Sequence, residues 1–197
     1  MSLISRLSKR EEQAWQRAAQ LYGPLVYRWA RRWGLQANDS EDLVQEVFQV
    51  LASGIDKFER QAGTGSFRRW LWGISRNKAS DHFRKLAKDV QAAGGTAANE
   101  AMQNMASLPP EEYGEGDDFD VDASLVHRAL ALLESDFQPQ TWRAFWRMAI
   151  DRQSAADVAE ELGMTKKGVR QAKYRVLQRL RAELDDEIDG DAIAAIS

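Results

Sequence analysis

Long hydrogen-bond donors gather on one side of the segment between Thr165 and Leu184. If this segment is helical, a rotation of about 100° per residue separates them from a row of small apolar residues. The donor side holds Lys167, Arg170, Gln171, Tyr174 and Gln178, and the apolar side holds Val169, Ala172, Val176 and Leu180. Such donors suit the major groove of DNA, because arginine can bridge guanine O6 and N7 and glutamine can bridge adenine N6 and N7. The alternative is an ordinary solvated helix face.

A short helix and a tight turn would hold this donor face in place. Ser154, with Asp157 three residues later, resembles a capping box that opens a helix, and Gly163 ends that helix. Met164 can pack inward, and Thr165 can cap the next helix. Two helices joined by a three-residue turn have the spacing of a helix-turn-helix. This spacing favours DNA binding over the solvated-face alternative.

A second polar face lies on the expected helix at residues 40–53. Its members are Asp42, Gln45, Glu46 and Gln49, and they lie opposite a broad apolar side. A side-chain cap from Ser40 or Asp39 is expected. Taken alone, these carboxylates fit a solvated face that the helix dipole favours. A catalytic pair is less favoured, because no histidine or lysine lies nearby in sequence and no phosphate-binding glycine loop is present.

The expected helix at 66–88 carries two apolar stripes and one basic face. The stripes are Phe67, Trp70, Leu71 and Ile74, and Trp72, Ala79, Phe83 and Leu86; the basic face is Arg69, Gly73, Arg76, Asn77, Ser80 and Arg84. Helical spacing favours burial of both tryptophans. The basic face follows a glycine-bearing loop, and together they offer the cations, amides and rings that single-stranded DNA recognition needs.

Composition restricts the remaining possibilities. The chain has 197 residues, 44% of them apolar and 29% charged, with no cysteine and two histidines. These features exclude a disulfide scaffold and a cysteine nucleophile, and we expect no catalytic residue, metal or cofactor. No long apolar run and no signal peptide are found, so we expect a soluble cytoplasmic protein without a membrane partner.

The net charge of −3 hides a strongly segmental distribution. Residues 1–90 carry 16 basic and 10 acidic residues, and residues 126–182 carry 11 and 6. The segment 91–125 has no basic and 8 acidic residues, and the segment 183–197 has none and 6. Two net-basic modules could therefore each face a polyanion.

Helical periodicity runs through both modules, so the expected fold class is all-α. Helices are predicted at about 9–21, 24–33, 40–53, 66–88, 122–134, 139–150, 154–162 and 165–184. The expected organisation is a helical domain at 1–90, a flexible acidic linker at 91–121, a helix-turn-helix domain at 122–184 and an acidic tail at 185–197.

Three stretches together resemble the bacterial RNA polymerase sigma factors of the extracytoplasmic-function (ECF) group. They are SEDLVQEVFQVL from Ser40, GSFRRWLWGISRNKASDHFRK from Gly65, and SAADVAEELGMTKKGVRQAKYRVLQRLRAEL from Ser154. The resemblance covers nearly the whole chain. It implies a non-enzymatic factor whose region two binds core RNA polymerase and melts the minus-ten element, and whose region four reads the minus-thirty-five element.

The resemblance also implies a role for individual residues. The core-polymerase contacts would be Asp42, Gln45, Glu46 and Gln49. The minus-ten DNA contacts would be Phe58, Arg60, Ser66, Arg69, Arg76, Asn77 and Arg84. The minus-thirty-five contacts would be Thr165, Lys166, Lys167, Arg170, Gln171, Tyr174 and Arg175. The acidic linker would run near the RNA path, and an anti-sigma factor is left open as a further partner.

Three alternatives predict different behaviour. A helix-turn-helix regulator independent of polymerase would bind duplex DNA alone, but it leaves the polar face at 42–49 without a purpose. A small helical hydrolase using Glu41, Asp42 and Glu46 with Mg²⁺ predicts metal-dependent turnover, but no partners converge on these carboxylates. A pure interaction protein predicts no DNA role. A further hypothesis is that the acidic tail at 185–197 mimics DNA.

Overall fold

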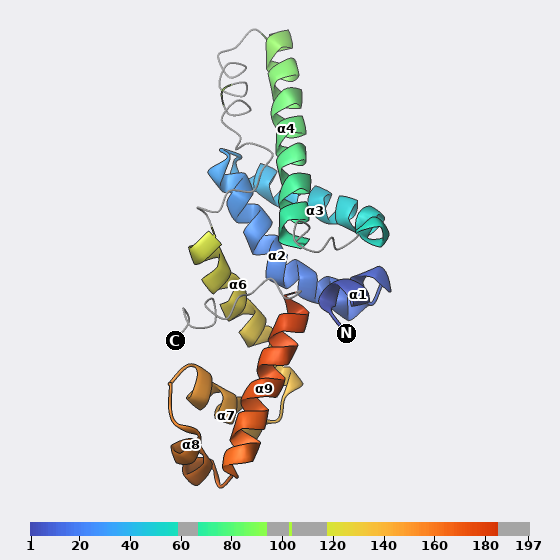
Figure 1. Cartoon of the computed structure of the whole chain (residues 1–197). Coiled ribbons are helices and arrows are strands. Elements are labelled where there is room, and N and C mark those ends of the chain that lie inside the picture. The colour runs from blue at the N-terminus through green and yellow to red at the C-terminus, as the bar shows by residue number, and fades with distance from the viewer. Residues whose placement is uncertain (59–66, 94–102, 104–117, 185–197) are drawn as a thin grey trace. The chain divides into compact units, whose positions relative to one another are not determined.

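The computed structural model describes residues 1–58, 67–93, 103 and 118–184. Within these ranges the regular elements are helices, and no strand occurs, which confirms the all-α class. The N-terminal elements are α1 (Leu3–Ser8), α2 (Glu12–Arg32), α3 (Ala37–Gly54), the 3₁₀ turn η1 (Ile55–Lys57) and α4 (Phe67–Ala93). The C-terminal elements are α6 (Asp118–Leu133), the 3₁₀ turn η3 (Glu134–Asp136), α7 (Pro139–Ala149), α8 (Ala155–Leu162) and α9 (Lys166–Glu183) (Figure 1).

The chain forms two compact units. One contains Met1–Arg17 and Gly116–Ser197, and the other contains Ala18–Glu115. The expected domain boundaries stay a prediction, and they differ from these units in the first 17 residues. Most of the expected linker at 91–121 lies outside the described residues, and its two ends lie in α4 and α6. The tail at 185–197 also lies outside them.

In the second unit, α3 packs along α4. Leu43, Val47 and Leu51 of α3 are buried, and so are Leu71 and Trp72 of α4. These residues recur every three or four positions, so each helix buries one stripe and leaves its other side to solvent. The packing brings the polar outer sides of α3 and α4 to the same edge.

The structure departs from the sequence predictions at three places in the N-terminal half. The expected break near residue 23 does not occur, and α2 runs through Pro24. Proline removes one backbone hydrogen bond, but Leu21, Leu25 and Val26 around it are at most 1% exposed, and this burial holds the helix together. The short helix α1 was not predicted at all.

The third difference concerns the start of α3. The helix begins at Ala37, and neither Ser40 nor Asp39 caps it. Ser40 lies inside the first turn, where its buried hydroxyl donates to the carbonyl oxygen of Gln36 at 2.7 Å. A serine that bonds back to a carbonyl four residues earlier sits in a helix rather than before it.

In the C-terminal helices, α9 packs against α6, α7 and α8. The small buried residues Ala144, Val158, Val169 and Ala172 form the contact between α7, α8 and α9, with Met164 packed against them. Because these side chains are small, the three helices approach closely and fix the direction of α9. The long polar residues of α9 are left on its outer side.

Gly163 makes the turn between α8 and α9. Its φ is +62°, in the left-handed region, and no atom lies within 4 Å of a β-carbon added there. Replacing it with alanine should therefore destabilise the fold only through backbone strain, by about 1 to 2 kcal/mol. Urea unfolding of Gly163→Ala checks this. A matched control is Gly73→Ala, since Gly73 lies inside α4 with equally open surroundings, and this change should stabilise by about 0.5 to 1 kcal/mol. No loss of stability in Gly163→Ala would contradict the strain.

Candidate functional site: two charged surfaces

A groove runs between α3 and α4, with a volume of about 440 Å³. From α3 it is lined by Asp39, Asp42, Leu43 and Glu46, and from α4 by Lys78, Asp81, His82, Lys85 and Leu86. Carboxylates stand on both walls, and the two leucines supply apolar surface between them. We call this feature the acidic groove.

Ion pairs cross the acidic groove from one helix to the other. Lys78 Nζ lies 3.2 Å from Glu46 Oε2, and His82 Nε2 lies 3.8 Å from Asp39 Oδ2. All of these side chains are at least 30% exposed, so water weakens the pairs. The groove is thus a hydrated surface of mixed charge. A partner with its own cations and apolar side chains could displace the water and replace these ion pairs.

The structure brings together only part of the predicted polymerase-binding set. Asp42, Gln45, Glu46 and Gln49 are all exposed on α3, but only Asp42 and Glu46 line the acidic groove. The α4 wall was missed by sequence reasoning. Its residues recur at helical spacing from Lys78 to Leu86, and that periodicity was the available signal. Leu86, predicted as part of a buried stripe, is instead 39% exposed, because it faces the groove beyond the packed length of α4.

The basic face of α4 is more solvated than its apolar stripes. Arg69, Asn77 and Arg84 are exposed, and Arg76 is half-buried. Arg84 is already paired, since its Nη1 lies 2.8 Å from Asp81 Oδ1. Two predicted minus-ten contacts, Arg60 and Ser66, lie outside the described residues.

An aromatic cluster stands at the start of α4. The ring of Phe58 lies 5.8 Å from that of Phe67 and 5.0 Å from that of Trp70, measured between centroids. Tyr22 contacts Phe67 edge to face at 5.0 Å. Phe67 and Trp72 are buried, but Phe58 and Trp70 keep part of their rings in solvent, so the predicted burial holds for Trp72 and only partly for Trp70. The cluster places two accessible rings next to the basic face.

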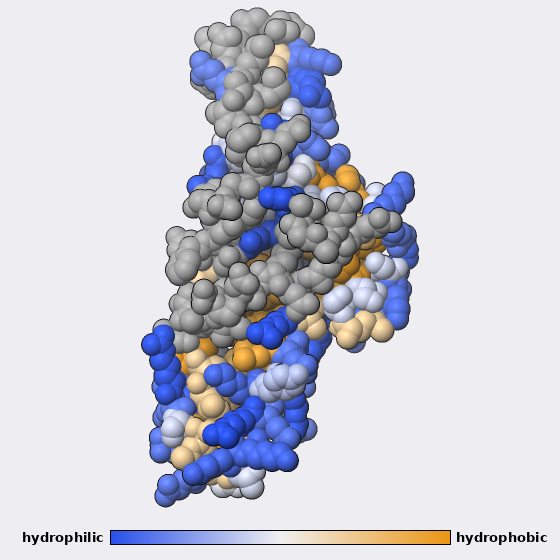
Figure 2. All heavy atoms as spheres, in the orientation of Figure 1, coloured by the Kyte–Doolittle hydropathy of each residue, from blue (hydrophilic) through white to orange (hydrophobic). Residues whose placement is uncertain are grey.

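The second charged surface is the outer side of α9. A side-chain cap opens each of the two helices: the backbone N–H of Asp157 donates to Ser154 Oγ at 3.2 Å at the start of α8, and that of Gly168 donates to Thr165 Oγ1 at 3.0 Å at the start of α9. The residues predicted for this surface are all exposed, namely Thr165, Lys166, Lys167, Arg170, Gln171, Tyr174 and Arg175. In Figure 2, hydrophilic residues cover much of the visible surface over α7–α9.

The cations of this surface differ from Lys78 and Arg84 of α4, each of which forms an ion pair with a carboxylate. Among the described residues, no ion pair is formed by Lys166, Lys167, Arg170 or Arg175. Tyr174 is 60% exposed, and its hydroxyl accepts a hydrogen bond from Gln178 Nε2 at 2.7 Å. A row of unpaired cations beside exposed amides can contact phosphates and base edges together.

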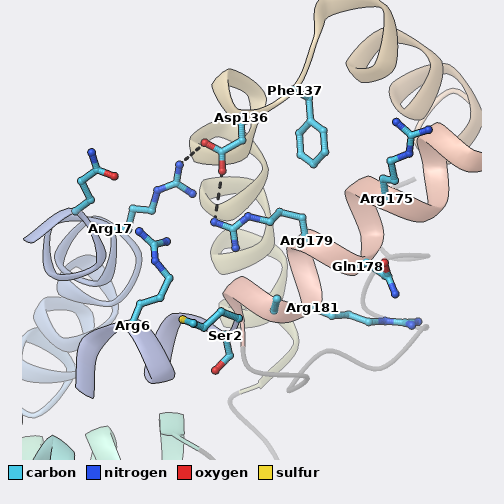
Figure 3. Close-up of a pocket in the computed structure, with 12 residues that line it drawn as sticks. Ser2, Arg6, Arg17, Asp136, Phe137, Arg175, Gln178, Arg179 and Arg181 are labelled. Carbon is cyan, nitrogen blue, oxygen red and sulfur yellow. Dashed lines mark hydrogen bonds and ion pairs between the residues drawn. The ribbon is translucent and has the colours of Figure 1, made fainter. Parts of the chain in front are cut away.

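A ring of four charges joins the first helices to the C-terminal ones, and sequence reasoning missed it. Figure 3 shows three of its members, Arg17, Asp136 and Arg179. Arg17 Nη2 lies 2.5 Å from Asp136 Oδ1, and Arg17 Nη1 lies 3.4 Å from Glu183 Oε1. Arg179 contacts the same two carboxylates, at 3.5 Å from Asp136 Oδ2 and 2.7 Å from Glu183 Oε2. The last contact is an ion pair outside hydrogen-bond geometry. We call these four residues the charge ring.

Because the charge ring is partly buried, its four side chains depend on one another for charge compensation. The side chain of Glu183 is 0% exposed, so its charge relies on the two arginines. The hydrogen bond to Asp136 raises the pKa of Arg17 above its ordinary value; burial opposes this shift, and the charge of Glu183 adds to it. The ring therefore ties Arg17 to α9 and η3 within one compact unit.

A known protein family matches the N-terminal helices. The model of the sigma-70 region 2 family matches residues 18–89, which run from α2 to α4. This part of the chain is thus similar to sigma-70 region 2. The acidic groove and the basic face of α4 both lie inside it.

Two curated relatives extend the likeness. The ECF RNA polymerase sigma factor BldN of Streptomyces coelicolor is 27% identical over 188 residues, which cover 95% of this chain and 66% of BldN. The RNA polymerase sigma factor NccH of Alcaligenes xylosoxydans xylosoxydans is 29% identical over 100 residues, covering 47% of this chain and 52% of NccH. The resemblance to ECF sigma factors is thereby confirmed, and the chain spans about two thirds and one half of the length of these relatives.

Two further findings concern metal binding and membrane spanning. Among the described residues, no group of three or more histidine, aspartate or glutamate side chains is arranged to hold a metal ion. In the same part of the chain, no helix is both long and apolar enough to cross a bilayer.

Proposed function

We propose that this chain is a sigma factor that binds core RNA polymerase and directs promoter-specific transcription initiation. The observation that carries the proposal is the region 2 match, because it falls on the helices that bear both the acidic groove and the basic, aromatic-flanked face. In this role the chain acts by binding and is not an enzyme. We expect it in the cytoplasm, with its polymerase and DNA partners.

The acidic groove is the proposed contact with core polymerase. Asp42, Gln45, Glu46 and Gln49 offer an exposed row of acceptors on α3, and α4 adds apolar surface at Leu86. A basic helix of the polymerase with a few apolar side chains fits this chemistry, since opposite charges fix its register and apolar contacts supply affinity. Lys78 would exchange its partner Glu46 for solvent when the helix docks.

The start of α4 is the proposed minus-ten surface. Phe58 and Trp70 are rings with accessible faces on which an unstacked base can rest. Asn77 is an exposed amide on the same helix as Arg69 and Arg76, which suits base edges and phosphates together. Holding an unstacked base offsets the few kcal/mol that removing it from the duplex costs. Arg60, Ser66 and Arg84 complete the proposed set.

The outer side of α9 is the proposed minus-thirty-five surface. Helix α9 is capped at its start and packs against α7 and α8, so its first two turns are held rigidly with their outer side in solvent. Arg170 and Gln171 are the proposed base readers, and Lys166, Lys167 and Arg175 the proposed phosphate contacts. Control by an anti-sigma factor is compatible with this arrangement, because either charged surface could be covered by a protein.

Removing one base-reading side chain should separate specificity from polymerase binding. Arg170→Ala is expected to lower the preference for the correct upstream duplex over a scrambled one by about 5-fold to 100-fold. Holoenzyme formation should be unchanged. Fluorescence anisotropy with both duplexes measures the ratio. Arg143→Ala is the matched control, because Arg143 is an exposed arginine of α7 outside the proposed surface. Equal binding of the parent chain to both duplexes would contradict the role of α9.

The second candidate is a helix-turn-helix regulator that works without polymerase, which the unpaired cations of α9 alone would support. It predicts the same upstream affinity with and without core polymerase. A sigma factor instead predicts tighter, position-specific binding in the holoenzyme, because polymerase links the upstream and downstream contacts. Footprinting the same promoter fragment under both conditions distinguishes them.

A further inference from the structure

A hollow of about 1010 Å³ in the C-terminal unit is bordered by side chains from both ends of the chain (Figure 3). Five of its lining residues are arginines, namely Arg6, Arg17, Arg175, Arg179 and Arg181. Asp136 is the carboxylate among the described lining residues. The lining side chains are therefore strongly cationic, if the carboxylates that pair with them from outside the hollow are left aside.

Three of the five arginines are already neutralised. Arg17 and Arg179 belong to the charge ring, and Arg6 Nε lies 2.8 Å from Glu11 Oε2. Arg175 and Arg181 are exposed, and neither forms an ion pair with another described residue. The unsatisfied positive charge of the hollow thus lies on these two side chains.

Arg175, Gln178 and Arg181 follow one another at intervals of three residues along α9, so they form an oblique row that turns through about 120° of the helix surface. Figure 3 shows Arg179 turned toward Asp136 and Arg17, whereas Gln178 and Arg181 lie on the other side of the helix. Gln178 between the two arginines is exposed, and it adds amide hydrogen-bonding groups. We call Arg175, Gln178 and Arg181 the arginine edge. It fits a flexible polyanion that can place carboxylates or phosphates along about two helical turns.

The chain supplies such a polyanion next to this edge. Helix α9 ends at Glu183, and the backbone N–H of Leu184 donates to the carbonyl oxygen of Leu180 at 3.0 Å. Glu183 and Leu184 are both buried, so the point where the chain leaves α9 is fixed. Residues 185–197 follow directly, with five acidic residues and no lysine or arginine. Direct attachment gives the segment an effective concentration in the millimolar range at the edge.

We propose that residues 185–197 bind the arginine edge in the free protein and compete there with nucleic-acid phosphates. The competition with nucleic acid rests on the proposed function, whereas the intramolecular contact does not. Exposed pairs of this kind are individually weak and strongly screened by salt. The segment therefore acts as an exchangeable cover that a duplex with many phosphates displaces.

The contact can be tested directly, because the chain has no cysteine. A nitroxide attached to Ile188→Cys should broaden the backbone amide signals of residues 175–181 at about 50 mM salt and release them at about 500 mM. Arg175→Gln with Arg181→Gln should abolish the broadening. Absence of broadening at low salt, or broadening that the arginine variant leaves intact, overturns the contact.

The competition is tested by neutralising the segment. Changing Asp185, Asp186, Asp189 and Asp191 to Asn and Glu187 to Gln should tighten binding of the full chain to upstream duplex by about 3-fold to 10-fold. The matched control neutralises five acids elsewhere, at Glu111, Glu112, Glu115, Asp117 and Asp118, and should change affinity less than about 2-fold. Equal effects of the two variants would overturn competition. Broadening without duplex binding by any variant would leave the contact standing and refute the proposed function.

Discussion

Reversing two carboxylates of the acidic groove, with Asp42→Arg and Glu46→Arg, is expected to weaken binding to purified core RNA polymerase by at least about 100-fold. This corresponds to about 2.7 kcal/mol. Both side chains are exposed on α3 and line the groove, so the fold should survive the change. Each substitution removes an acceptor and adds a cation against a basic partner, and like charges across an interface cost several kcal/mol.

The control variant must make the same change in net charge at positions outside the acidic groove. Glu134→Arg with Glu160→Arg reverses two exposed carboxylates of the C-terminal unit and should leave core binding within about 2-fold of the parent. Native gel shift or analytical ultracentrifugation with core polymerase gives the affinities, and circular dichroism checks the helices. Unchanged holoenzyme formation by the Asp42 and Glu46 variant would refute the groove as the contact.

Removing one arginine of the charge ring should cause the largest loss of stability. Arg17→Ala leaves the fully buried Glu183 with Arg179 as its remaining ion-pair partner in the ring. The change removes the hydrogen bond to Glu183 Oε1 and half of the positive charge beside this buried carboxylate, so it should destabilise the fold by about 1 to 3 kcal/mol. Hydrogen exchange should show lost protection along α9, and urea unfolding should show the lower free energy.

A double substitution distinguishes the buried charge from simple loss of packing. Arg17→Met with Glu183→Leu removes both charges while keeping apolar volume, so it should cost less than Arg17→Ala alone. The difference is the mark of an ion pair whose members depend on each other. If the double variant is less stable than the single one, the ring is a packing contact and the interpretation of Glu183 is wrong.

Local patterns allowed most of the helices to be predicted. The Ser154 and Thr165 caps, the Gly163 turn and the apolar row of α9 are set by residues within one helical turn of each other. The exposed polar row on α3 follows from the same periodicity. The continuous α2 could not be predicted, because a proline at residue 24 reads locally as a break, and only tertiary burial overrides it.

The missing half of the candidate site depends on contacts between distant residues. Arg17 and Glu183 are 166 positions apart, and nothing near either residue indicates the other. The α4 wall of the acidic groove was hidden for a different reason. Lys78, His82 and Leu86 read as parts of a mixed helix until α3 packs beside them and turns one side of α4 into a wall.

The most direct measurement is run-off transcription with purified core polymerase, followed by sequencing of the transcript starts. The proposed function predicts that the chain converts core polymerase, which alone starts without promoter preference, into an enzyme that starts at discrete positions sharing an upstream and a downstream element. The Asp42 and Glu46 variant should lose this activity, and Arg170→Ala should blur the upstream element. Starts that do not change when the chain is added would contradict the role of this protein as a sigma factor.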